Sequence, residues 1–372
     1  MAASIPIPLT GARAHTHVSG DEVDAARAAL LVSLDTVPIY RIAIELEAVT
    51  PVALSFYPGS ALRGAVVQAL LDTHCSNKAA PSCAACPLVM ACPVAALVAP
   101  MRDEAPRGRD VPRPFTITPP ALDAAVVETG ARFTFGLTLF GRAAALFPYV
   151  VLSRPRLEAN GLGIRNEAGR RGRVAVRRIS SLGDGTEAVL YSPGVRTVGA
   201  PREGKARSAI ALRAEALPAH RLTLRFITPM RLVADGMVQP RVRPSTLVHR
   251  ILERWEGIRR EYATPGMPDP LAPLRGAVSN SALGDPRVLL AVADTVEVAR
   301  DDTHWLDLAS YSSRQRRFTP IGGVLGDLTL AGPLAALSEV LALGEVIHAG
   351  KDVVKGNGCF TVAETGRPEP WN

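Results

Sequence analysis

One order of strands and helices is repeated in outline in the two halves of the sequence. Residues 39–49 alternate apolar and polar side chains, as a half-buried strand does, and an apolar helix follows from Pro58. The order restarts at His220, where an alternating strand is followed by an amphipathic helix over 244–262. With the later strands and the second helix of each half, both halves have the order β-α-β-β-α-β. The sequence therefore predicts an α+β protein with two tandem ferredoxin-like domains.

The repeat also predicts how the chain is divided. The 372 residues are 47% hydrophobic, which is enough to build a buried core in each half. No run approaches the roughly 18 apolar residues of a membrane span, and the first residues lack a signal-peptide pattern, so we expect a cytoplasmic protein without membrane contact. The expected parts are an amino-terminal extension, a first domain, a second domain and a tail, at 1–37, 38–218, 219–364 and 365–372.

Positive charge is concentrated in one part of the chain. The sequence has 38 arginines and four lysines and a net charge of +7, and residues 154–213 alone carry 13 basic and 5 acidic side chains. A localised basic stretch favours a nucleic-acid backbone as partner, although a solvated, glycine-containing basic loop would have the same composition. Aromatic residues make up only 5%, which argues against base stacking as the main binding mode. The candidate contacts are Arg170, Arg171, Arg173, Arg177 and Arg178, and Arg314, Arg316 and Arg317 in a second loop.

Four of the five cysteines are clustered in the first half. Cys75, Cys83, Cys86 and Cys92 have the spacing C-x7-C-x2-C-x5-C within a loop at 75–92, and Cys359 is expected to be a small core residue. Four thiolates in one short loop can hold a cation tetrahedrally, and we expect a structural Zn²⁺. An iron–sulfur cluster uses the same four ligands, and four unliganded thiols are the third reading.

Several blocks of the sequence resemble one known protein family. In order, over about residues 38–363, they are similar to the CRISPR repeat-processing endoribonucleases of the RAMP superfamily, in their cysteine-containing branch. The resemblance implies a protein that binds CRISPR repeat RNA, cuts it without a catalytic metal, and stays on the mature guide with other effector-complex subunits. The blocks are PGSALRGAVVQAL, CAACPLVMACP, LTLRFITPMRL, YSSRQRRFTPIGGVLGDLTLAG and LGEVIHAGKDVVKGNGCFTV.

RNA cleavage without a metal has general chemical requirements. The 2′-hydroxyl next to the scissile phosphate is the nucleophile, so the protein must supply a base, an acid for the leaving 5′ oxygen, and cations for the charge on the phosphorane. The products are a 2′,3′-cyclic phosphate and a 5′-hydroxyl. The resemblance places a catalytic histidine inside the first helix, where this sequence has Gln68.

The departure at Gln68 leaves two functions open. His74, two helical turns further along, is the candidate base, with Tyr57 and Arg63 as positioning groups. His74 adjoins Cys75, so it could instead be a helix-end residue or a metal ligand. Since glutamine cannot accept the proton, an inactive subunit that binds the repeat hairpin is the alternative function. A metal-containing DNA-binding protein is a third class, but the sequence has no helix-turn-helix or two-histidine finger spacing.

The glycine-rich block near the carboxyl end supplies the last candidates. His348 and Lys351 match positions that are histidine and lysine in the family, and Lys355 can replace a charge that the family has elsewhere in the block. Its glycines would allow backbone amides to approach an RNA phosphate. A glycine loop that only joins a helix to a strand is the structural alternative.

Overall fold

The computed structural model describes residues 18–100, 111–122, 125–183, 186–195, 197–263, 285–312 and 317–363. The predicted contacts Arg314 and Arg316, and the tail 365–372, lie outside these residues.

The first domain contains a five-stranded antiparallel sheet with the order β3-β5-β1-β6-β7. Its alternating strand places Ile42, Ile44 and Leu46 on the buried face, against α2 and the short helices α4 and α5. Without the edge strand β7, the strand order is that of a ferredoxin-like domain. The elements are β1 (Ile39–Ala48), α2 (Gly59–His74), β3 (Phe115–Thr118), β5 (Arg132–Phe140), α4 (Phe147–Leu152), α5 (Arg154–Asn160), β6 (Val174–Gly183) and β7 (Thr186–Tyr191).

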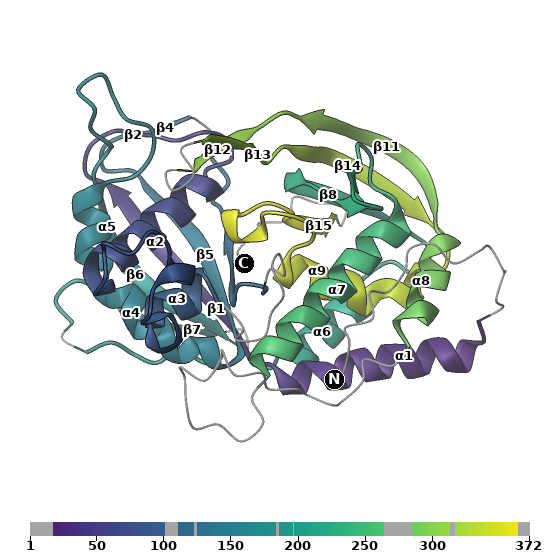
Figure 1. Cartoon of the computed structure of the whole chain (residues 1–372). Helices are drawn as coiled ribbons and strands as arrows, with labels where there is room; N and C mark the ends of the chain where they lie inside the picture. Colours follow the sequence, from purple (N-terminus) through teal and green to yellow (C-terminus); the bar gives the residue numbers. More distant parts are fainter. Residues whose placement is uncertain are drawn as a thin grey trace.

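The second domain repeats this architecture (Figure 1). Its four-stranded antiparallel sheet has the order β11-β14-β8-β15, again ferredoxin-like. Trp255 and Ile258 of the long helix α7 are buried in its core, as the amphipathic pattern predicts. The tandem ferredoxin-like fold is therefore confirmed. The elements are β8 (Arg221–Met230), α7 (Pro244–Tyr262), α8 (Pro286–Asp294), β11 (Glu297–Leu306), β14 (Gly323–Ala331), α9 (Ser338–Ile347) and β15 (Phe360–Ala363).

Two helices lie in segments for which the sequence analysis expected none. Helix α1 (Gly20–Ser33), in the predicted extension, begins with a capping box between Ser19 and Glu22. Helix α6 (Ala206–Glu215) lies in the predicted basic stretch. Both pack against the core of the second domain, and Trp255 Nε1 donates a hydrogen bond to Ser33 Oγ at 2.8 Å. Few apolar positions of these helices are buried, namely Ala26 and Leu30 in α1 and Ile210 and Ala214 in α6. The helical period of apolar residues in the sequence is therefore weak.

Smaller elements connect these parts. Between β1 and β5 lie β2 (Val52–Ala53), η2 (Cys83–Ala85), η3 (Val89–Ala91), α3 (Pro93–Val98) and β4 (Val126–Val127), with η1 (Leu34–Thr36) before and η4 (Gly141–Leu146) after. Strands β9 (Val233–Ala234) and β10 (Met237–Val238) form a small hairpin after β8. The second domain also contains β12 (Ala309–Ser312), β13 (Arg317–Pro320), η6 (Leu334–Leu337) and η7 (Val353–Lys355).

Close backbone contacts hold the two domains together. A Cβ atom on Gly59 would lie 2.1 Å from the carbonyl oxygen of Lys355, and one on Gly141 would lie 1.8 Å from that of Tyr262. Only glycine permits such an approach at these two positions. The start of α2 therefore lies directly against η7 of the second domain. Among the described helices, none is both long and apolar enough for a membrane span.

Candidate functional site

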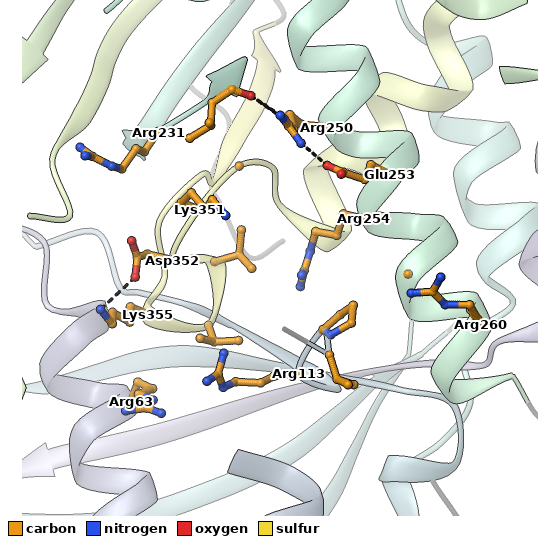
Figure 2. Close-up of a pocket in the computed structure, with 17 residues that line it drawn as sticks. Arg63, Arg113, Arg231, Arg250, Glu253, Arg254, Arg260, Lys351, Asp352 and Lys355 are labelled. Carbon is orange, nitrogen blue, oxygen red and sulfur yellow. Dashed lines mark hydrogen bonds and ion pairs between the residues drawn. The ribbon is translucent and has the colours of Figure 1, made fainter. Parts of the chain in front are cut away.

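A cavity of about 490 Å³ lies between the two domains, and most of its polar side chains are basic (Figure 2). The first domain contributes residues from α2 and the segment before β3. The second domain contributes residues from α7, the end of β8 and the loop after α9. Glu253 and Asp352 are the acidic side chains of the lining, against eight basic ones: Arg63, Arg113, Arg231, Arg250, Arg254, Arg260, Lys351 and Lys355.

Helix α7 supplies one wall of this cavity. Arg250, Arg254 and Gly257 are spaced by four and three residues and so share one face of the helix. A Cβ atom on Gly257 would lie 2.8 Å from Cγ of Pro112, so the small residue allows the segment with Arg113 to approach the helix. The spacing of the arginines on α7 and the close contact between Gly257 and Pro112 together bring cations of both domains to one cavity.

Arg254 has the most unusual environment in the cavity. Its side chain is half-buried in the cavity wall, and burial lowers the pKa of the guanidinium to about 10. Its Nε donates a hydrogen bond to the carbonyl oxygen of Ile347 at 2.8 Å, while its buried Nη2 has no partner among the described residues. Figure 2 shows the guanidinium pointing into the cavity. A buried cation with an unused donor is a ready-made partner for an anion.

Arg63 is the second desolvated cation. Burial lowers the pKa of its guanidinium, and the positive charge of Arg113 lowers it further, while Asp352 acts in the opposite direction. Its buried Nε has no hydrogen-bond partner in the part of the chain that the structure describes. Two arginines from different domains therefore carry donor groups that no described residue satisfies.

Some of the other charges in the cavity are neutralised within the protein. Arg250 pairs with Glu253, Lys355 with Asp352 at 2.9 Å, and Arg260 with the buried Glu261 at 3.4 Å. Within the part of the chain that the structure describes, the remaining five have no carboxylate partner: Arg63, Arg113, Arg231, Arg254 and Lys351. The cavity is therefore suited to a ligand with several negative charges.

The glycine-rich block forms the loop that carries Lys351 and Lys355. Gly350 has φ of +83°, and a Cβ atom there would lie 2.5 Å from the carbonyl oxygen of Arg231. The amide of Lys351 donates to that same oxygen at 2.9 Å. These contacts fix the loop against the end of β8, with both lysines on the cavity.

His348 belongs to the domain interface and does not line the cavity. Its ring is buried, and Nε2 lies 3.2 Å from Oγ1 of Thr118 in the first domain. Burial, reinforced by the nearby charge of Arg254, lowers the pKa of the imidazole to about 3. His348 is therefore neutral at physiological pH. Its ring contacts Thr118 and not solvent.

Of the three predicted catalytic residues, His74 is separated from Arg63 along α2. Arg63 lines the cavity, but His74 lies eleven residues further along α2, or about 16 Å at the rise of an α-helix. His74 Nε2 lies 3.1 Å from the carbonyl oxygen of Tyr149, and the two rings pack edge to face. Tyr57 precedes the helix and is half-buried, and burial raises the pKa of its hydroxyl. No histidine of the described residues lines the cavity.

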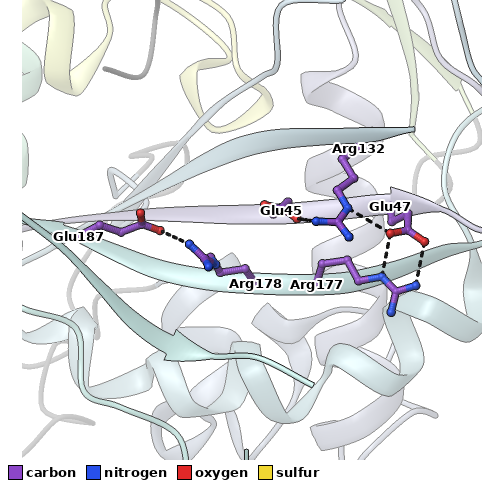
Figure 3. A network of polar contacts seen from close by, with 6 residues as sticks. All are labelled: Glu45, Glu47, Arg132, Arg177, Arg178 and Glu187. Carbon is purple, nitrogen blue, oxygen red and sulfur yellow. Dashed lines mark hydrogen bonds and ion pairs between the residues drawn. The ribbon is translucent and has the colours of Figure 1, made fainter. Parts of the chain in front are cut away.

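The arginines of the basic stretch fall into two groups. Arg177 makes two hydrogen bonds to Glu47, at 2.8 and 3.0 Å, and Arg178 pairs with Glu187 at 3.4 Å (Figure 3). These two charges are largely compensated within the sheet. The second group is exposed and consists of Arg170, Arg171 and Arg173. Arg317, at the start of β13, is exposed as well.

The four clustered cysteines are half-buried and form no disulfide. Across the described parts of the chain, no three His, Cys, Asp or Glu side chains are grouped closely enough to hold a metal ion. The four thiols therefore do not form a metal site in this structure, although zinc prefers a set of four thiolate donors. The zinc site stays a prediction.

Comparison with known proteins identifies the relationship. The family model for the "CRISPR-associated endoribonuclease Cas6" matches residues 224–360, and a model described as an N-terminal domain matches 37–203. No curated protein matches the sequence significantly.

Two solved structures illustrate the similarity. The "Partial Cas6-RT-Cas1–Cas2 complex" has a TM-score of 0.51 and 12% identity, over 88% of this chain and 46% of that chain. Thermus thermophilus Cas6 has a TM-score of 0.46 and 16% identity, over 88% of this chain and 99% of that one.

The strand orders define a protein with two tandem ferredoxin-like domains. Through the model match over residues 224–360 the chain is a CRISPR-associated, Cas6-like protein, in agreement with the resemblance of the sequence blocks. Its similarity to the Cas6 endoribonucleases supports RNA binding and RNA cleavage.

The sequence analysis found only part of the cavity. It singled out Arg63, Lys351 and Lys355, but none of the five other basic residues. The arginine pair at 250 and 254, on the polar side of a clearly amphipathic helix, was an available signal. The remaining three follow from the packing of the two domains, which spacing does not encode.

Proposed function

We propose that this protein binds CRISPR repeat RNA in the cytoplasm and cleaves it without a metal, with the RNA backbone in the cavity between the domains. The carrying observation is the convergence of five cations from both domains, including the half-buried Arg254, that have no carboxylate partner among the described residues. The Cas6 family match supports RNA as the polyanion. Other CRISPR effector subunits are the further partners in this proposal.

The cavity suits the electrostatic part of the cleavage reaction. When the 2′-hydroxyl attacks the phosphate, negative charge accumulates on the phosphorane oxygens, and guanidinium groups already fixed in position stabilise it. In a desolvated cavity this stabilisation is stronger than in water. Breaking the bond to the 5′ oxygen, which takes a proton from water, then leaves a 2′,3′-cyclic phosphate and a 5′-hydroxyl. Arg63 and Arg254 are the side chains proposed to contact the reacting phosphate.

His74 is the proposed base, but it lies about 16 Å along α2 from Arg63, so this role requires that the RNA also follows α2 toward His74. If His74 takes the proton, His74→Ala lowers the cleavage rate about 10²- to 10⁴-fold at a fixed pH. If solvent hydroxide takes the proton, His74→Ala leaves the rate unchanged. Cleavage rates of both proteins at one pH decide between the two routes.

The direct experiment uses the repeat RNA in chelator. We expect cleavage to give cyclic phosphate ends, and a single deoxyribose at the cleavage position to block cleavage while leaving binding intact. Cleavage of the deoxy substrate, or a strict requirement for a divalent metal, would refute the proposed mechanism.

A second function is favoured by one specific observation. Gln68 stands where the family resemblance places a histidine, and its Nε2 donates to Asp72 at 2.8 Å on the exposed side of α2. With no histidine lining the cavity within the described residues, the protein could act as a non-cleaving subunit that holds the repeat hairpin. Tight binding of repeat RNA without any cleavage, with and without Mg²⁺, would identify this function.

We also propose that the cysteine loop binds a structural Zn²⁺ through its four thiolates. Bound zinc would draw the thiolates together and tie α2 to α3 through the loop. Metal analysis of the purified protein should give one zinc per chain, lost in Cys83→Ser. Iron with visible absorbance would identify a cluster instead, and no metal in protein that retains four reduced thiols would refute the site.

A further inference from the structure

The hairpin between β12 and β13 carries two exposed aromatic side chains. Tyr311 and Phe318 are paired across the hairpin, with ring centroids 5.2 Å apart and an interplanar angle of 61°. Their exposed fractions are 53% and 70%. Of the ring pairs in the described part of the chain, this is the one exposed on both sides. Two large apolar rings in water are unfavourable unless a partner covers them.

A contact with the first domain orients this pair. Ser310 Oγ lies 2.5 Å from Oγ of Ser60 at the start of α2. Since successive side chains on a strand point to opposite faces, the face with Tyr311 and Phe318 is directed away from α2. The hairpin arches from the second domain toward the first (Figure 1), and the contact between Ser310 and Ser60 holds it against α2.

The base of the hairpin adjoins the cationic cavity. Arg231, which lines the cavity, donates a hydrogen bond from Nη1 to the carbonyl oxygen of Gly322 at 2.9 Å and stacks over the ring of Trp305 at 5.8 Å. Tyr311 is six residues beyond Trp305, at most about 20 Å along extended strands. A chain of phosphates that occupies the cavity can therefore reach the aromatic pair within a few nucleotides.

The sequence of the hairpin favours RNA over a protein partner. Arg317 precedes Phe318 in β13, and the sequence of 312–317, SSRQRR, contains three arginines and no acidic residue. Exposed aromatic rings and a basic sequence on one hairpin match the two components of a nucleotide, since rings take the base and cations take the phosphate.

We propose that Tyr311 and Phe318 form a stacking platform for an unpaired base of the RNA that occupies the cavity, an inference that rests on the proposed function. Low overall aromatic content argues against stacking along a whole sheet, but these two rings are concentrated at one point. Because every base has a π face, the platform recognises an unpaired nucleotide with little sequence preference. It distinguishes a stem with a single-stranded flank from a blunt stem.

The test compares two RNA probes on matched variants. One probe is a stem-loop with six unpaired adenosines, one replaced by fluorescent 2-aminopurine, and the other is the same stem with a blunt end. Tyr311→Val and Phe318→Val keep the strand preference while removing the ring. Phe318→Trp restores a ring, and Leu212→Ala, at an exposed position on α6, is the control.

We expect each valine variant to bind the flanked probe about 5- to 150-fold more weakly, with no change for the blunt stem. Phe318→Trp restores the affinity, and the 2-aminopurine signal changes on binding only when the rings are present. The salt dependence of binding stays the same, because no phosphate contact is removed.

The outcomes separate this inference from the function on which it rests. Equal affinities of wild type and both valine variants, or equal losses for the flanked and blunt probes, overturn the stacking platform while the proposed function stands. Failure of the wild type to bind either probe overturns the proposed function.

Discussion

Replacing Arg254 with methionine should stabilise the protein without RNA while weakening its binding of RNA. At neutral pH the guanidinium is charged in both the folded and the unfolded chain. Burial lowers its pKa in the folded state from 12.5 to about 10, so carrying that charge into the folded state costs about 3 kcal/mol. Methionine has a similar length and carries no charge.

The expected size of the stabilisation follows from the contacts that are lost. Arg254→Met removes one hydrogen bond, from Nε to the carbonyl oxygen of Ile347, which contributes about 1 kcal/mol. Relief of the buried charge outweighs this loss, so the free energy of unfolding should rise by about 2 kcal/mol at pH 7. The gain should shrink above about pH 10, where the native guanidinium of the wild type loses its proton.

The effect on RNA binding has the opposite sign. If five cations each neutralise one phosphate of a single strand, log K falls with log salt with a slope of about −3.5, and Arg254→Met reduces the slope to about −2.8. Urea unfolding and RNA titrations at 50 to 200 mM salt measure both effects. Arg287→Met, at an exposed position on α8, is the control and should change neither.

Each result can refute one part of this reasoning. A salt slope that Arg254→Met leaves unchanged would show that Arg254 contacts no phosphate. A lower free energy of unfolding would show that its charge is compensated in the folded protein and that its role is structural.

Three further predictions concern the interface, pH and the basic stretch. Gly59→Ala should destabilise the protein by about 1–3 kcal/mol in urea unfolding, since its Cβ would overlap a carbonyl oxygen, whereas Gly64→Ala, with nothing within 4 Å, should stabilise it by about 0.5–1 kcal/mol. Because the folded-state pKa of His348 is lowered to about 3, its contribution is complete above pH 6.5 and is lost as pH falls, by about 2 kcal/mol at pH 5. The variant His348→Gln should lack this part of the pH dependence of unfolding, and an identical pH profile would contradict it. Arg171→Gln should reduce the RNA salt slope by about 0.7, whereas Arg177→Gln, whose charge Glu47 already compensates, should leave it unchanged; equal effects would contradict the role of that ion pair.

The sequence by itself determined the order of the elements and the family. Side-chain alternation in 39–49 and helical spacing in 244–262 are local properties, so they predict β1 and α7 without any knowledge of their neighbours. Twice repeated, that order specifies the ferredoxin-like strand arrangement. The helices α1 and α6 were missed because their apolar residues face a partner from another part of the chain.

Only the tertiary structure decided which charges are available to a ligand. Arg177 is compensated because β6 lies beside β1, which brings in a carboxylate 130 residues away in the sequence. Arg63 and Arg254 line one cavity because Gly59 allows α2 to approach the second domain. The availability of a charge depends on the distance to its counter-ion and on burial, and folding sets both by bringing together residues that lie far apart in the chain.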